Sequence, residues 1–210
     1  MNENYLKNNR VFLSGCVVRE PQYSHELFGE GFYEFYLEVK RLSGQTDVLP
    51  VTVSERIMNG ADLSEGALVA LSGQFRSYNK LANEHSKLML TVFVRDFLPY
   101  DPDEQNPNVV ELNGYICKPP VYRTTPFNRE ICDVLLAVNR GYNKSDYIPC
   151  IAWGRNVKFA QRLEVGDNIS VSGRMQSREY QKKTEDDVIT KVAYEISVSK
   201  IETKPKINSI

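Results

Sequence analysis

The sequence has no long hydrophobic segment. No apolar run approaches the roughly 18 residues that a membrane-spanning helix requires, and the N-terminal residues MNENYLKNNR lack the apolar core of a signal peptide. Glycine and proline are also scarce, at 12 and 10 of 210 residues, which excludes collagen-like and low-complexity chains. With 41% hydrophobic and 25% charged residues, the composition is that of an ordinary folded protein. We therefore expect a globular protein of the cytoplasm.

Sequence motifs of enzymes and of metal sites are missing as well. There is no P-loop, no GxGxxG, no GxSxG and no paired-carboxylate motif. The two histidines, His25 and His85, have no neighbouring pattern for zinc binding or catalysis. The acidic run over residues 185–187 is the one candidate for a metal, and a solvated hairpin tip explains it better. We expect neither an enzyme nor a bound cofactor or metal.

The cysteines are few and widely spaced. The four are Cys16, Cys117, Cys132 and Cys150. None of them forms the CxxC spacing of a zinc or redox site, and all lie in strand-like segments. We expect buried free thiols rather than disulfides or metal ligands.

The whole chain has no excess of charge of one sign. Its 26 basic and 27 acidic residues give a net charge of -1. This balance conceals an asymmetry between the two halves. Residues 1–105 carry 10 basic and 15 acidic side chains, a net charge of -5. Residues 106–210 carry 16 basic and 12 acidic side chains, a net charge of +4. A polyanionic partner is therefore expected to prefer the second half.

The two halves are copies of one unit. At an offset of 99, Gly15, Tyr23, Val39, Arg41, Pro50 and Arg56 match Gly114, Tyr122, Val138, Arg140, Pro149 and Arg155. At an offset of 100, Leu63, Gly66, Ser72, Gly73 and Ser77 match Leu163, Gly166, Ser172, Gly173 and Ser177. Residues 101–107 contain two prolines and no apolar side chain, which indicates a linker. We predict a first repeat over residues 1–100, a second repeat over residues 108–203 and a short basic tail over residues 204–210.

Alternation of apolar and polar residues predicts strands in both repeats. The second repeat is expected to have strands over 110–116, 131–140, 147–154, 168–181 and 188–201, with a short helix over 155–164 that Gly166 ends. The first is expected to have strands over 10–19, 32–41, 47–54, 68–78 and 87–97, with a helix over 56–63. Three strands, a helix and then a hairpin is the order of the OB-fold. The predicted fold class is therefore all-β, with two tandem five-stranded OB-fold barrels, each with one short helix between strands three and four.

One face of the second repeat combines cations with aromatic rings. On the fourth strand, Arg174, Arg178 and Tyr180 share the parity that points away from the barrel, and the third strand places Tyr147 and Trp153 on one parity. Residues 139–183 hold nine basic and only four acidic residues, a local net charge of +5. The nine are Arg140, Lys144, Arg155, Lys158, Arg162, Arg174, Arg178, Lys182 and Lys183.

This combination suits single-stranded nucleic acid, because cations neutralise phosphates while flat rings stack on unpaired bases of any identity. A plainer explanation exists for each residue taken alone. A single tryptophan in a strand usually belongs to a core, and basic residues on a strand face are usually solvated. Phe159 follows the apolar stripe of the predicted helix, and we assign it to the core.

The second repeat resembles the bacterial single-stranded-DNA-binding protein family. The resemblance is most specific from Ala152-Trp-Gly through Gly166-Asp to Ser172-Gly-Arg-Met-Gln-Ser-Arg-Glu-Tyr. It implies base stacking on Tyr142, Tyr147, Trp153 and Tyr180, with Arg178 and Arg174 at the family's basic positions. Together with the surrounding cations, the expected phosphate contacts are Arg140, Lys144, Arg155, Arg174, Arg178, Lys182 and Lys183. Because four OB-folds form the working unit in such proteins, the resemblance also implies a homodimer.

The chain departs from this family in three respects. The first repeat has Leu42 or Ser43, Val48 and Ser54 where the second has its rings, so we expect a weak binder or a scaffold for dimer contacts. Pro149 in the third strand favours an edge or bulge. The tail over residues 204–210 lacks the acidic, hydrophobic tip with which family members recruit replication and repair proteins, so recruitment by that route is in doubt.

Two functions from different classes follow. The leading hypothesis is a non-catalytic, nucleoid-associated protein that binds and protects single-stranded DNA during replication, recombination or repair. Stacking alone does not distinguish DNA from RNA, so RNA stays open. The alternative is an OB-fold interaction module of a primosome or replication-restart complex. Its main surface would be the aromatic hairpin of the first repeat, which holds Phe28, Phe32, Tyr33, Phe35 and Tyr36.

Overall fold

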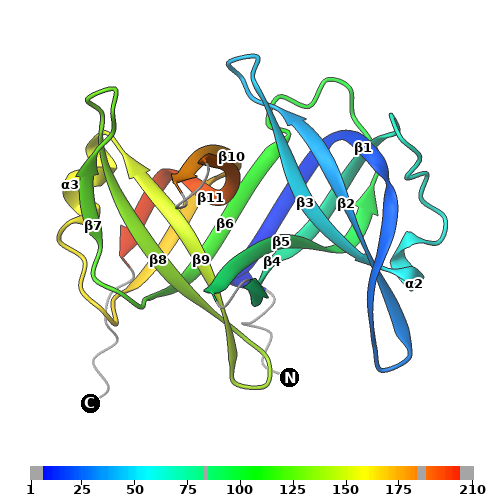
Figure 1. Ribbon diagram of the computed structural model, residues 1–210, viewed down its shortest axis with the longest axis horizontal. Coiled ribbons are helices and arrows are strands. Elements are labelled where there is room, and N and C mark those ends of the chain that lie inside the picture. Colours follow the sequence, from blue (N-terminus) through cyan, green and yellow to red (C-terminus); the bar gives the residue numbers. More distant parts are fainter. Residues whose placement is uncertain (1–6, 83–84, 184–187, 204–210) are drawn as a thin grey trace.

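The structure, a computed structural model, describes residues 7–82, 85–183 and 188–203. Two closed β-barrels lie side by side, one built from each repeat (Figure 1). The predicted fold class of two tandem OB-folds is confirmed. The acidic run over residues 185–187 and the tail over residues 204–210 lie outside the described residues.

The first barrel closes through five strands. Its elements are β1 (Asn9–Leu27), β2 (Glu30–Lys40), β3 (Thr46–Ser54), α2 (Glu55–Met58), β4 (Leu68–Ala82) and β5 (His85–Leu98). The strand β1 pairs with both β2 and β4, and β3 pairs in parallel with β5, which completes the ring. The helix between the third and fourth strands is shorter than the predicted span over 56–63.

The second barrel repeats this order with one additional strand. Its elements are β6 (Asn108–Ile116), β7 (Val121–Thr124), β8 (Glu130–Arg140), β9 (Lys144–Trp153), α3 (Arg155–Ala160), β10 (Asn168–Lys183) and β11 (Val188–Thr203). The strand β7 was not predicted. Pro119 and Pro120 lack backbone N–H groups, so they divide into β6 and β7 what is one long strand in the first repeat. The helix α3 ends at Ala160, four residues before the predicted boundary.

Inward-facing residues of alternating strand positions fill both barrels. Phe35 and Phe75 are fully buried in the first, and Leu136, Ile148 and Met175 are fully buried in the second. Phe159 packs against this core, as predicted. These apolar side chains account for the closure of each sheet, because a closed barrel buries one face and leaves no free strand edge.

The glycines that match between the repeats mark close backbone crossings. A Cβ atom on Gly15 would lie 2.2 Å from the carbonyl oxygen of Glu38, and one on Gly114 would lie 2.5 Å from that of Ala137. Any larger residue would push β1 from β2, or β6 from β8. The barrel geometry therefore explains this part of the sequence repeat.

A strand pairing joins the two barrels into one continuous sheet. The strands β1 and β6 run side by side and antiparallel, with Val11 opposite Val110 (Figure 1). These two valines are 99 residues apart, so the pairing relates equivalent positions of the two repeats. Arg10 and Glu111 form an ion pair of 3.2 Å across it.

Two equivalent asparagines fasten β4 and β10 near this junction. The side-chain amide of Asn9 donates to the carbonyl oxygen of Phe75 at 3.1 Å and accepts from its N–H at 2.8 Å. Asn108 bonds Met175 in the same way, at 2.7 and 2.9 Å. At this junction the two repeats are therefore related by an approximate two-fold axis, which these side-chain contacts obey.

Two buried carboxylates lock each repeat to the fourth strand of the other. Asp47 of β3 accepts from the N–H and hydroxyl of Ser177 at 2.7 and 3.0 Å. Asp146 of β9 accepts from the N–H of Ser77 at 2.8 Å. Neither carboxylate is exposed to solvent. We call these two contacts the aspartate latches.

Candidate nucleic-acid interface

The candidate interface follows β9 of the second barrel. The residues of β9 alternate, so Ile148 and Cys150 enter the core while Tyr147 and Trp153 take the outward parity. Tyr147 is 46% exposed, and its N–H donates to Ser77 of the first repeat at 2.7 Å. Trp153 is half-buried, and its indole N–H finds no partner among the described residues.

Pro149 lies in this strand without a bulge. It stands opposite Leu135 in an uninterrupted register with β8. The pairing of β9 with β11 covers only residues 150–152, so Pro149 lies outside it. The expected edge-like environment is present, and the strand keeps Tyr147 and Trp153 on the same parity.

The turn between β8 and β9 exposes Tyr142. This residue lies between β8 and β9 with a φ of 62° and is 94% exposed. A left-handed backbone is unusual for a residue with an aromatic side chain and costs conformational energy. The turn therefore exposes the Tyr142 ring to solvent, where the ring is free to stack on a base.

The fourth strand supplies a ring with a cation beside it. The guanidinium of Arg178 lies 5.8 Å from the centre of the Tyr180 ring. It also pairs with Glu195, a nearly buried carboxylate of β11, at 3.3 Å. Arg178 is thereby held in place with 45% of its side chain still exposed.

Arg140 and Arg174, predicted phosphate contacts, lie beside the aspartate latches. Arg140 is 3.7 Å from Asp146, and Arg174 is 3.7 Å from Asp47. Burial and repulsion from Arg41 lower the pKa of Arg174, against the attraction of Asp47. Each keeps about a third of its side chain in solvent, at 34% and 38%. Their role toward phosphate stays a prediction, and the ion pair of Arg174 with Asp47, which joins the two repeats, is an addition that the sequence did not indicate.

The remaining predicted cations differ in how well they are described. Lys144, at the start of β9, and Arg155, at the start of α3, are exposed. Lys182 and Lys183 end β10, and their side chains lie outside the described part of the structure. The structure thus brings Tyr142, Tyr147 and Lys144 together at one end of the β8–β9 hairpin and leaves Arg155 at the other.

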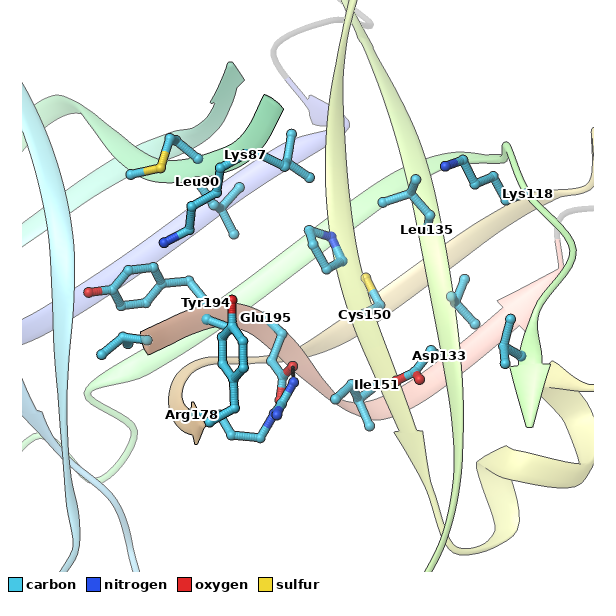
Figure 2. A pocket seen from close by; sticks show the side chains of 18 of the residues that line it. Lys87, Leu90, Lys118, Asp133, Leu135, Cys150, Ile151, Arg178, Tyr194 and Glu195 are labelled. Atoms are coloured by element: carbon cyan, nitrogen blue, oxygen red, sulfur yellow. Dashed lines mark hydrogen bonds and ion pairs between the residues drawn. The ribbon is translucent and has the colours of Figure 1, made fainter. Parts of the chain in front are cut away.

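A groove of about 440 Å³ lies beside these strands, and several of its residues were not predicted (Figure 2). Arg123 of β7 pairs with Asp133 of β8 at 2.5 Å on one wall. Lys118 follows β6, and Lys87 comes from β5 of the first repeat. A basic residue flanking a strand was the only sequence signal for Lys118, and nothing local to Lys87 indicated that it would lie against the other repeat.

The corresponding surface of the first repeat is different. Leu42 is exposed and Val48 is 37% exposed where the second repeat has rings, and Ser54 is buried. Of the predicted aromatic hairpin, Phe35 is in the core and Phe28 is 99% exposed at the turn. The first repeat has its own groove of about 850 Å³, which Arg140 of the second repeat also borders.

Metal-binding clusters and membrane-spanning helices are absent from the described residues. Within the described residues, no three His, Cys, Asp or Glu side chains gather in a way that could hold a metal ion. No described helix is long and apolar enough to cross a membrane. All four cysteines are free, with Cys132 and Cys150 buried and the other two half-buried. Burial raises the pKa of the Cys150 thiol to about 12.

Comparison with known proteins gives a consistent family. The model of the single-strand binding protein family matches residues 107–203. The single-stranded DNA-binding protein 1 of Staphylococcus aureus is 37% identical over 81 residues, which are 35% of this chain and 48% of that protein. The single-stranded DNA-binding protein 1 of Clostridium acetobutylicum is 37% identical over 84 residues, 35% of this chain and 74% of that protein. Against the first of these relatives, the matched region spans about half of the relative's length.

A solved structure extends the likeness to both repeats. A deletion mutant of the single-stranded DNA binding protein from Thermus aquaticus superposes with a TM-score of 0.72, covering 93% of this chain and 94% of that one. The wild-type protein of the same organism superposes with a TM-score of 0.66. The sequence identities are 21% and 23%, so these structures support the tandem fold alone.

Proposed function

This chain belongs to the single-strand binding protein family, and we propose that it binds and protects single-stranded DNA with little sequence preference. The observation that carries the proposal is the β8–β9 hairpin, where Tyr142 and Tyr147 expose their rings beside Lys144. The charge of +5 over residues 139–183 attracts the phosphate backbone to the same surface.

The mechanism divides between rings and cations. Bases stack on Tyr142, Tyr147, Trp153 and Tyr180, each worth roughly 1–3 kcal/mol, and every base has a face to offer. The backbone phosphates are held by Arg140, Lys144, Arg155, Arg174, Arg178, Lys182 and Lys183. Because neither interaction reads the edge of a base, the affinity depends little on sequence.

Trp153 provides the direct test, because it is the only tryptophan in the chain. Oligo-dT added to the protein at low salt is expected to quench its fluorescence. If about five phosphates are contacted, the logarithm of the affinity falls with the logarithm of salt concentration with a slope near -3.5. Unchanged emission, with no binding by anisotropy of a labelled oligo-dT either, would overturn the proposal. An oligo-U titration run in parallel reports on RNA.

We further propose that two copies associate to bring four OB-folds together. The surface beside the β1–β6 junction supports this, because Val109 of β6 and Leu98 of β5 each expose 37% of their surface there. They border a groove of about 530 Å³ that a second copy can cover. Light scattering of the free protein tests it: a dimer has twice the chain mass of 24.1 kDa.

The proposed role is non-enzymatic and belongs to replication, recombination or repair at the nucleoid, in the cytoplasm, where unpaired DNA arises. In this division the second repeat carries the main binding surface and the first acts as scaffold and weak binder. The alternative of a primosome interaction module is not favoured, because the matching family and the matching relatives are single-stranded DNA-binding proteins. Replication and repair proteins remain proposed partners.

A further inference from the structure

The hairpin of β4 and β5 extends beyond the first barrel. Pairing of β4 with β1 stops at Gly73, and β5 meets β3 only at residues 92–93. Past these points β4 and β5 pair with each other alone, from Ser77 opposite Leu90 to Lys80 opposite Lys87 and beyond. We call the paired strand segments over residues 76–82 and 85–90 the first arm.

The first arm is fastened to the second repeat by an aspartate latch. Asp146 accepts from the N–H of Ser77, and the Ser77 hydroxyl accepts from the N–H of Tyr147 at 2.7 Å. These bonds fix the arm against the start of β9. Because Leu90 is opposite Ser77 in the hairpin, the same contact carries residues 87–90 to the edge of the groove of the second repeat.

The groove is therefore built by both repeats. Figure 2 shows Lys87 and Leu90 on one wall and Arg178, Tyr194 and Glu195 on the other. The lining also includes the apolar residues Leu135, Pro149 and Ile151 of the β8–β9 sheet. Apolar lining together with cations fits a chain whose flat bases lie inward and whose phosphates lie at the rim.

The charges along the walls are not equivalent. Arg123 is paired with Asp133, and Arg178 is paired with Glu195, so both are partly neutralised. Lys87 and Lys118 form no ion pair with any described residue of the chain. Lys87 is also exposed. An exposed ammonium that pairs with none of the described carboxylates is free to exchange its counterion for a phosphate.

We propose that this groove is a composite site for single-stranded DNA, in which Lys87 of the first repeat binds a phosphate of the strand held by the second. The inference rests on the proposed function and gives the first repeat a direct part in it. The bound DNA thereby bridges the first arm and the second repeat, the same two surfaces that the Asp146 latch joins.

The test is Lys87→Glu in the full chain, titrated with oligo-dT at several salt concentrations. The expected result is a loss of affinity of about tenfold at low salt and a salt slope shallower by about 0.7, the share of one phosphate in a single strand. Lys87→Gln, which removes the charge without adding a repulsive one, is expected to give the same change in slope with a smaller loss of affinity.

The matched control is Arg56→Glu, which makes the same change of charge in the same repeat. Arg56 is exposed on α2 and lines none of the grooves described above. It is expected to leave the affinity within about twofold, because exposed charges further apart than a Debye length are screened. Equal losses in the two variants would reduce the effect to overall charge and overturn the proposal.

The outcomes separate this inference from the proposed function. If the unaltered protein fails to bind oligo-dT, the proposed function itself fails. If it binds while Lys87→Glu binds with unchanged affinity and slope, the site is confined to the second repeat and only the composite site is overturned. Thermal unfolding of each variant checks that the fold is intact, as expected for an exposed side chain.

Discussion

The two repeats have the same barrel and differ in the surroundings of several aromatic side chains. In the first, the ring of Phe93 lies within 5.7 and 5.6 Å of the Arg76 and Arg95 guanidinium groups. Arg19 lies 5.3 Å from the ring of Tyr36. In the second, the hairpin rings of Tyr142 and Tyr147 face solvent. Arginines of the first repeat thus lie over Phe93 and Tyr36, whereas Tyr142 and Tyr147 of the second repeat keep their rings exposed to a ligand.

Groove size does not decide between the repeats. The groove of the first repeat is larger, at about 850 Å³ against 440 Å³. Its Arg76 is already engaged, since Arg76 donates to Gln74 at 2.9 Å and pairs with Asp146 at 3.5 Å. Burial lowers the pKa of Arg76 further than Asp146 raises it. The comparison teaches that inward positions preserve the barrel while outward positions are free to diverge, so that the same fold carries a net charge of -2 over residues 1–100 and +2 over residues 108–203.

The largest expected effect comes from removing the exposed rings of the second repeat. Replacing Tyr142, Tyr147 and Tyr180 by Ala together is expected to lower affinity for oligo-dT by more than about a hundredfold, since each stacked base contributes roughly 1–3 kcal/mol. Trp153 fluorescence measures it, because that residue is untouched.

A matched triple variant of the first repeat serves as its control. Tyr23, Phe28 and Tyr100 are exposed there, outside the first arm, and are replaced by Ala in the same way. An affinity within about threefold of the unaltered protein is expected, since single surface rings outside the strand's path contribute little. Comparable losses from the two triple variants would break the distinction between the repeats.

The second-largest expected effect comes from the aspartate latches, to which each repeat contributes one buried carboxylate. Asp47→Asn is expected to lower the free energy of unfolding by about 2–3 kcal/mol, because it leaves Arg41 and Arg174 without a buried carboxylate. Arg41 pairs with Asp47 at 2.6 Å. Urea unfolding measures the change, and Asp146→Asn is the equivalent variant at the other latch.

The pH dependence of this effect follows from the Asp47 carboxyl. Burial would raise its pKa, but the bonds from Arg41 and Ser177 outweigh burial and hold it below the ordinary value. A lowered pKa in the folded state stabilises fully above the ordinary aspartate value near 4, and this contribution is lost as pH falls through the folded value. The difference between the unaltered protein and Asp47→Asn should therefore be constant from about pH 5 to 8 and shrink below about pH 4. A difference that persists unchanged in acid contradicts this account.

The fold was predictable because its signals are local. Strand alternation has a period of two, so a short stretch shows both the strand and its buried face, as with Ile148 and Cys150 against Tyr147. Because the sequence is repeated, the same order of strands and helix was expected in both halves. Helix ends were less accurate, since Gly166 has a positive φ of 95° but lies in the turn before β10, six residues beyond the end of α3.

The contacts between repeats could not be predicted in the same way. Asp47 and Ser177 are 130 residues apart, and no pattern near either one shows that they meet. Arg140 and Arg174 therefore read as free surface cations, although each lies beside a buried carboxylate. One signal was present in the repeat, since Asp47 matches Asp146 at the offset of 99. A charged residue kept in two copies whose surfaces otherwise diverge indicates a contact that both copies need.

The smallest expected effect is a gain, and it tests whether the first repeat lacks only a ring. Val48 of β3 is 37% exposed at the position that matches Tyr147. Val48→Tyr is expected to raise affinity for oligo-dT about fivefold, near the lower end of one stacked base, without changing the salt slope. Val48→Ile, apolar and without a ring, is the control and should bind as the unaltered protein does. If Val48→Tyr gives no gain while Lys87→Glu still weakens binding, the DNA contacts the first repeat at its arm and not on its barrel. The divergence of the two copies is then a difference in the path of the DNA rather than in one side chain.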